Sequence, residues 1–169
     1  MQQENRHLQQ DYRPSPKQSL LSNALLVGGI FSVVSILGLT LIPILGSISL
    51  PLLFMLWALV CRNYVREKGN GVRTSYGELL SRNTMISFMA SPFCGFANLL
   101  YAKIIDPEGF NETMKQSIEL LNFSAQQQEM FDKISESAFM MFFANAMGFI
   151  FMSMFVVLIV SLFYIRRKK

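Results

Sequence analysis

The chain has 169 residues, which is enough for one domain, and carries a formal net charge of +4 at neutral pH. Hydrophobic residues make up 51% of it and charged residues only 15%, a balance too apolar for an ordinary soluble domain of this length. Charged residues are absent from three long stretches, 20–60, 83–102 and 137–165. Because about 20 apolar residues cross the roughly 30 Å of hydrocarbon in a bilayer, the sequence predicts a polytopic membrane protein.

The first apolar stretch follows a polar tail, residues 1–19, and is twice as long as one crossing needs. The helix breakers Pro43 and Gly46 indicate where it folds back. We therefore expect spans near 20–42 and 47–64, joined by a very tight turn. The tail lacks the short apolar core and small-residue cleavage site of a signal peptide, so the first helix is expected to be retained.

The sequence REKGNGVRTSYGELLSRN follows the second span and is the most highly charged internal segment. Its Gly-Asn-Gly run at 69–71 predicts a turn. Ser75 followed three residues later by Glu78 is a capping box, which would start a helix at Tyr76 that runs into a third span near 83–105. The glycine spacing is not that of a phosphate-binding loop, so we interpret the segment as a turn and a helix start.

The segment 106–137 separates the third span from a fourth, expected near 138–164. Pro107 ends the third span, and Ser124 with Gln127 forms a second capping box. Apolar residues recur at helical spacing on both sides of that box. The pattern predicts two short amphipathic helices lying on the outer membrane face.

The distribution of charge predicts the orientation of the chain. Cations precede the first span, fill the 61–82 loop and close the chain at 166–169, whereas 106–137 holds two lysines against seven acids. By the positive-inside rule both termini and the 61–82 loop are cytoplasmic. The expected fold is therefore an all-α bundle of four transmembrane helices in two hairpins, in the cytoplasmic (inner) membrane. The net charge then reflects topology, and we expect the lipid bilayer rather than nucleic acid as a partner.

Two features suggest how the third and fourth spans pack. Asn98 and Asn145 both lie seven residues in from the outer ends of their spans, and Gly95 and Gly148 both lie ten residues in. We expect the helices to approach closely at these glycines, with the asparagine side chains bonded to each other. The alternative is that each asparagine bonds to backbone or lines a wet cleft. Small residues recur at steps of four in both spans: Ser87, Ser91 and Gly95, then Ala144 and Gly148.

Groups that could perform chemistry are sparse. The single histidine, His7, lies in the polar tail, which argues against histidine-based catalysis and metal binding. Methionines between 130 and 154 could bind Cu(I), but their spacing holds no single helical face and no His or Cys lies near them. Cys61 and Cys94 lie at different depths, so we expect them to pack as small apolar side chains and not to form a disulfide. We therefore expect no catalytic, cofactor or metal site.

Three segments in order, CRNYVREKGNGVRTSYGELLSRN, LLYAKIIDPEGF and the closing RRKK, carry a family resemblance. The chain resembles the domain of unknown function 4199 family, small four-helix membrane proteins of Gram-negative bacteria, from about residue 18 onward. The most specific elements are Ser75 to Glu78 and the pair Asp106 and Pro107. The resemblance implies a fold and a compartment but no activity. Members are often encoded near a membrane glycosyltransferase, which is compatible with a partner role but is no evidence for one.

These observations favour a non-catalytic accessory or scaffold subunit of a cytoplasmic-membrane complex, with a membrane enzyme or further copies of the chain as partners. The alternative is a small oligomeric transporter or channel. A carrier usually places ionisable residues inside the bilayer. Here Arg82 and Lys103 lie at the two ends of the third span, and none lies between them.

The predicted topology can be tested with reporter fusions. A fusion of alkaline phosphatase at Lys169 should be inactive, and one within 111–135 should be active, because the enzyme folds only outside the cytoplasm. Phosphatase activity at Lys169 would contradict the cytoplasmic placement of the C-terminus.

Overall fold

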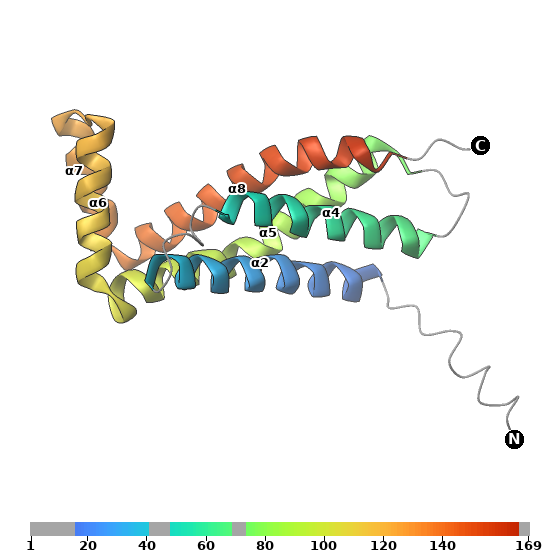
Figure 1. Ribbon diagram of the computed structural model, residues 1–169, viewed down its shortest axis with the longest axis horizontal. Coiled ribbons are helices and arrows are strands. Elements are labelled where there is room, and N and C mark those ends of the chain that lie inside the picture. Colours follow the sequence, from blue (N-terminus) through green and yellow to red (C-terminus); the bar gives the residue numbers. More distant parts are fainter. Residues whose placement is uncertain (1–15, 41–47, 69–73, 166–169) are drawn as a thin grey trace, which may run out of the picture.

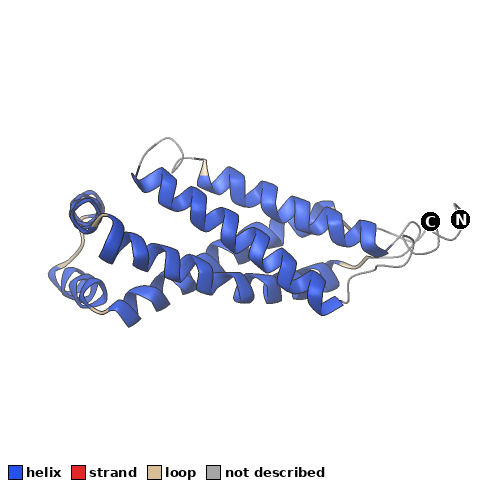
Figure 2. Ribbon diagram, turned by 90° about the horizontal axis from the view of Figure 1, so that it is seen from below, coloured by secondary structure: helices blue, strands red, loops and turns tan. Residues whose placement is uncertain are grey.

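The computed structural model describes residues 16–40, 48–68 and 74–165, and every regular element in these ranges is a helix. The long helices of an elongated bundle are α2 (Pro16–Thr40), α4 (Ser49–Lys68), α5 (Tyr76–Leu100) and α8 (Ala138–Phe163) (Figure 1). After α5 come the π-helical turn η1 (Tyr101–Ile105), α6 (Pro107–Leu121) and α7 (Ala125–Glu136). Both α6 and α7 lie across one end of the bundle, where Figure 2 shows them end-on. The expected all-α class is confirmed.

The long helices lie close to the predicted spans. α2 covers most of 20–42, α5 and η1 cover 83–105, and α8 covers all but the last residue of 138–164. Several expected features lie outside the described residues: most of the N-terminal tail, the turn at Pro43 and Gly46, the turn at 69–71, and the basic 166–169.

Three segments are long and apolar enough to cross a membrane: Ser19–Leu37, Tyr76–Ile105 and Ala138–Phe163. Large apolar side chains are exposed on them, including Phe88, Phe151 and Phe155. An apolar surface of this extent is suited to contact with lipid rather than water. α4 differs because Arg62, Arg66, Glu67 and Lys68 fall in its last seven residues, yet it packs within the same bundle.

α5 occupies the centre of the bundle and makes its most extensive contacts with α8 and α2. α4 covers the remaining side, where it contacts α2 and α8 and buries Trp57 completely. The shared core is apolar and consists mainly of aliphatic side chains, among them Val27, Leu53, Leu79, Ile86, Val156 and Val157, together with the aromatic Phe149.

Two glycines allow the backbones of neighbouring helices to come close. A Cβ atom on Gly28 of α2 would lie 2.8 Å from the carbonyl oxygen of Ala90 in α5. A Cβ on Gly95 of α5 would lie 2.8 Å from the carbonyl oxygen of Phe142 in α8. Real Cβ atoms do not approach carbonyl oxygens so closely, so any larger residue would force the helices apart. α5 thus contacts both neighbours through positions that require glycine.

Pro92 lies inside α5, where it removes one backbone donor and leaves the carbonyl four residues earlier without its usual partner. The hydroxyl of Ser91 donates to that carbonyl, Phe88 O, at 3.0 Å. A hydroxyl next to a proline is a common way to satisfy the freed backbone inside a membrane. The proline is therefore accommodated locally, without any need for a gating role.

The two helices that connect α5 to α8 each begin with a well-formed cap. The side chain of Asp106 accepts a hydrogen bond from Gly109 N at 3.0 Å, and Pro107 occupies the first turn of α6. Ser124 and Gln127 form the complete reciprocal capping box at the start of α7. The two predicted helices of the segment 106–137 and this second capping box are thus confirmed.

A substitution at Gly28 should test the close approach of α2 to α5. Gly28→Val should lower the free energy of unfolding by roughly 1–3 kcal/mol, because the added methyl groups meet backbone atoms that cannot move aside. Unfolding by denaturing detergent, followed by far-UV circular dichroism, measures the change. Gly29→Val is the matched control because a Cβ there meets nothing within 4 Å. Equal effects at the two glycines would contradict the proposed contact.

Candidate functional site

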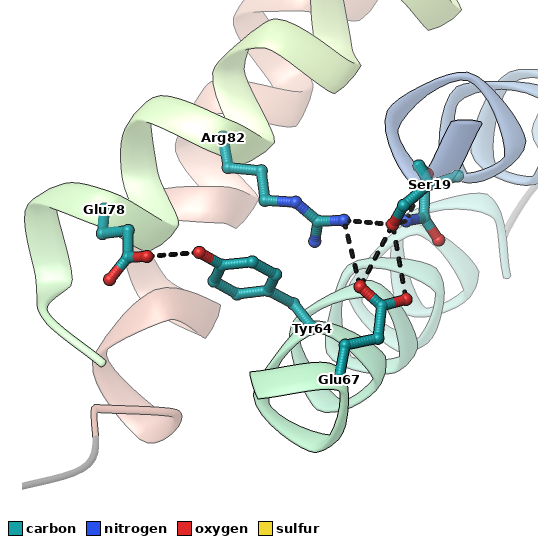
Figure 3. Close-up of polar contacts among 6 residues, drawn as sticks. Ser19, Tyr64, Glu67, Glu78 and Arg82 are labelled. Atoms are coloured by element: carbon teal, nitrogen blue, oxygen red, sulfur yellow. Dashed lines mark hydrogen bonds and ion pairs between the residues drawn. The ribbon is translucent and has the colours of Figure 1, made fainter. Parts of the chain in front are cut away.

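A cluster of polar side chains joins α2, α4 and α5 at the end of the bundle opposite α6 and α7 (Figures 1 and 3). The start of α5 positions one half of it. The hydroxyl oxygen of Ser75 caps the helix by accepting a bond from Glu78 N at 3.3 Å, and the helix begins at Tyr76 as predicted. This cap fixes the first turn of α5, which directs Glu78 toward α4 and places Arg82 one turn deeper.

Glu78 connects α5 to the end of α4. Its carboxylate accepts a short hydrogen bond from the Tyr64 hydroxyl and forms a salt bridge with the Lys68 ammonium group. Tyr64 and Lys68 lie one turn apart on α4, so one carboxylate can reach both. The side chain of Glu78, which the sequence predicted to take part in the helix cap, ties α5 to α4.

The hydrogen bond that Lys68 donates to Glu78 raises the pKa of Lys68 above its ordinary value of 10.5, because it stabilises the charged ammonium form. A group with a raised pKa in the folded state contributes stability at pH values below its unfolded pKa. That contribution is lost only as the pH rises through the folded pKa. Near neutral pH Lys68 is therefore charged, and its contribution to stability is present.

Arg82 connects α5 to both other helices of the cluster. Its Nη2 donates to Ser19 Oγ at 2.6 Å and lies 3.8 Å from Glu67 Oε2, while the Ser19 hydroxyl also contacts both oxygens of Glu67 at 3.2 and 3.3 Å (Figure 3). The guanidinium stacks over the Tyr64 ring with Cζ 4.1 Å from the centroid. Only 12% of the Arg82 side chain is exposed. A shielded cation with a carboxylate, a hydroxyl and an aromatic face around it contributes more than an exposed ion pair.

A smaller polar contact lies deeper in the bundle. Asn83 is completely buried, and its Nδ2 donates to Cys61 Sγ at 3.0 Å. The second cysteine, Cys94, accepts from Ser32 Oγ at 3.6 Å. Both thiols are free and buried on different levels of the core, consistent with the expectation that they pack rather than pair.

The six residues of this cluster form a clamp between helices at the end of the bundle: Ser19, Tyr64, Glu67, Lys68, Glu78 and Arg82. Both carboxylates of the cluster are engaged by cations and hydroxyls, and its tyrosine donates to a carboxylate. Within the described ranges, no group of three or more His, Cys, Asp or Glu residues could hold a metal ion. The cluster therefore offers contacts that hold three helices in register.

The expected asparagine pair is not formed. Asn98 Nδ2 donates to Cys94 O at 3.1 Å, and Asn145 Nδ2 donates to Met141 O at 2.8 Å, each within its own helix. Of the two arrangements considered for these residues, the structure has the backbone bonds. Each side chain satisfies a donor locally, which removes the need for a partner across the helix interface.

The glycines behave differently from each other. Gly95 lies in the predicted close contact with α8, but it faces Phe142. Gly148 is exposed, and a Cβ there would meet nothing within 4 Å. Phe142 precedes Gly148 by six positions, or about 9 Å along a helix. The prediction counted residues from the outer ends of the two spans and assumed that these ends lie at the same level. The contact of Gly95 with Phe142 instead places the start of α8 beside Leu99. The η1 turn therefore extends beyond the start of α8.

Sequence reasoning missed most of the clamp. Ser75 and Glu78 were identified as a helix cap, but the contacts of Ser19, Glu67 and Arg82 were not. Glu78 and Arg82 are four residues apart, which places them on one face of the helix. This spacing was the sequence signal that could have indicated a shared polar face on α5. The partner helices could not be assigned without knowing how α2 and α4 lie against α5.

Removal of the Arg82 guanidinium should weaken the clamp. Arg82→Leu should lower the free energy of unfolding by roughly 1–3 kcal/mol, because it leaves polar groups of α2 and α4 without their shared donor. Arg82→Lys should have a smaller effect, since an ammonium group keeps the charge but not the planar contacts. Thermal unfolding in detergent measures both.

The control is Lys133→Leu, which removes an exposed i,i+4 pair with Glu129 and should cost less than about 0.5 kcal/mol. If Arg82→Leu were as stable as this control, the clamp would not be a stabilising feature.

Comparisons with known proteins agree with this description. No curated protein and no solved structure matches the chain. The model of one family, described as a protein of unknown function (DUF4199), matches residues 22–166. That range includes α4, α5, η1, α6, α7 and α8, and all but the first turns of α2. The match extends over most of the chain, and the chain belongs to the DUF4199 family.

Proposed function

We propose that the protein is a non-catalytic accessory or scaffold subunit of a complex in the cytoplasmic membrane. In this proposal α4 is a fourth span beside the three apolar ones, and α2 with α4 and α5 with α8 form two hairpins. The described chain begins in α2 and ends after α8 at the same end of the bundle (Figure 1). That end, where α4 ends and α5 begins, faces the cytoplasm according to the distribution of cations.

The observation that carries the proposal is the hairpin of α6 and α7, which lies across the opposite end of the bundle (Figure 1). α7 buries none of its residues. Leu120 and Met130 are 80% and 53% exposed, although both are large apolar side chains. An ordered hairpin that contributes so little to the core has its surface available for another molecule.

The hairpin is nonetheless held in a defined position. Lys103 Nζ, from η1, donates to Ser135 O in α7 at 2.7 Å. Tyr101 packs edge-on against Phe110 at 6.3 Å between ring centroids. Ser137 caps α8 directly after α7 by accepting from Met140 N at 3.3 Å. A held, exposed hairpin is better suited to presentation to a partner than a freely moving loop.

The chemistry of the hairpin indicates the kind of partner. Between α6 and α7 lies a cleft of about 170 Å³ with both polar and apolar lining, including Met114, Ile118 and Asp132. The segment 106–137 has seven acids and two lysines. The preferred partner is therefore a membrane enzyme whose extracytoplasmic surface is basic, with an apolar side chain that enters the cleft.

Affinity purification from gently solubilised membranes tests the proposal. The wild-type chain should retain a stoichiometric membrane-enzyme partner through size exclusion. Replacement of exposed acids of the hairpin, Glu119→Lys with Glu129→Lys, should abolish that partner by charge repulsion. The neutral pair Glu119→Gln with Glu129→Gln should retain part of it.

Two outcomes would contradict the accessory role. A partner retained equally by the wild type and the lysine variant would show that the hairpin does not dock it. A purified homo-oligomer that moves solute across liposomes without a partner would favour the transporter alternative.

A further inference from the structure

A groove lies on the outside of the bundle between α4 and α8. The C-terminal ends of these two helices lie at the same end of the molecule (Figure 1). The part of the groove that lies farther from the C-terminal end of α4 has a volume of about 370 Å³ and is almost entirely apolar. The side chains that shape it on α4 are Phe54, Met55 and Ala58, and the α8 wall ends at Phe163 and Tyr164. This part lies within the apolar length of both helices.

The groove continues toward the cytoplasmic end into a second part of about 290 Å³. Phe163 and Tyr164 line both parts, so the two parts adjoin on the surface. The second part is lined from α4 by Arg62, Val65 and Arg66. Along one groove, apolar lining therefore gives way to basic lining.

The two arginines differ from Arg82 and Lys68, two further cations described at this end of the bundle. Arg82 and Lys68 are engaged by Glu67 and Glu78 in the clamp described above. Arg62 and Arg66 are exposed, and no acid in the described part of the chain forms a salt bridge with either. They lie one helical turn apart, about 6 Å, so both guanidinium groups can contact a single phosphate.

The geometry points to a binding site for one anionic glycerophospholipid, with its phosphate on Arg62 and Arg66 and an acyl chain in the apolar part of the groove. Ala58 lies one turn from Arg62, and its small side chain leaves room where the chain would enter. Met55 and Phe163 are 64% and 82% exposed on the rim, facing the hydrocarbon rather than the core. A phosphate with an attached acyl chain matches both parts.

A lipid fits this groove better than a soluble ligand or a peptide. The apolar part opens sideways on the surface of the bundle, so its occupant must come from within the bilayer. Paired arginines at the headgroup level attract anionic lipid, at about 1 kcal/mol for each cation near the surface. The site rests on the part of the proposed function that makes α4 a membrane span. It uses no residue of the hairpin of α6 and α7, so its test is separate from the test of the partner role.

Native mass spectrometry of the purified chain in detergent can measure the binding. Titration with phosphatidylglycerol should give one tight adduct, and phosphatidylcholine should bind at least tenfold more weakly. Arg62→Gln with Arg66→Gln should weaken phosphatidylglycerol binding about 10- to 30-fold, the factor expected for the loss of two cations at the phosphate. Binding of phosphatidylcholine should change little.

Two further variants separate the parts of the site. Ala58→Phe fills the apolar part and should weaken binding of both lipids. Lys115→Gln with Lys133→Gln removes the same charge from the opposite end of the molecule and should leave phosphatidylglycerol binding unchanged. Circular dichroism of each variant checks that it is folded, and Arg62→Lys with Arg66→Lys, which keeps both charges, should retain most of the lipid preference.

The source of the phosphate is tested by competition. Millimolar glycerol 3-phosphate should not displace phosphatidylglycerol, because it lacks the acyl chain. Displacement by glycerol 3-phosphate would overturn the lipid assignment in favour of a soluble phosphate ligand. An unchanged preference for phosphatidylglycerol in the double glutamine variant, or an equal loss in the Lys115 and Lys133 control, would overturn the site itself.

Discussion

The close approach of α5 to its two neighbours is the constraint on which the rest of the bundle depends. In a bilayer, apolar side chains gain little by leaving lipid for protein, so helices associate through close packing and hydrogen bonds. Gly28 brings α2 against the backbone of α5, and Gly95 brings α5 against α8. These contacts fix α5 at the centre. α4 then completes the core with Trp57, and its outer side forms one wall of the surface groove.

Charge divides the molecule into two ends with different tasks. At one end, Arg82 and Glu78 hold α5 to α2 and α4 through a network of ion pairs and hydroxyl groups. Arg62 and Arg66 remain outside that network, on the adjacent surface. At the other end, the hairpin of α6 and α7 carries mostly acids and buries little. Ion pairs therefore connect the helices at one end, whereas the charged side chains at the other end are mostly exposed.

The two proposals place separate surfaces in contact with separate molecules. The lipid site lies on the side of the bundle and uses cations that the clamp leaves free. The partner site lies across the end and uses the acids and the cleft between α6 and α7. Because α8 links the two regions as one continuous helix, both surfaces keep a fixed relation to each other. Such a relation suits a scaffold, which positions a partner relative to the bilayer.

The sequence by itself determined the elements of this protein. Uncharged runs set the long helices, and short-range chemistry set their boundaries, because capping by Ser75, Asp106 and Ser124 involves residues only three positions away. It also indicated that Gly95 lies at a helix contact.

Only the tertiary structure decided which faces meet. α8 is apolar on every side, so no periodicity distinguishes its buried face from its lipid-facing one. Gly148, which was expected to face α5, lies on the exposed side of α8. The register of α5 on α8 depends on where η1 ends relative to the start of α8, which residue counting cannot give. The clamp around Arg82 joins residues more than 60 positions apart on three helices. Such contacts arise from packing between helices. The spacing of residues along one helix therefore cannot identify the partners on another.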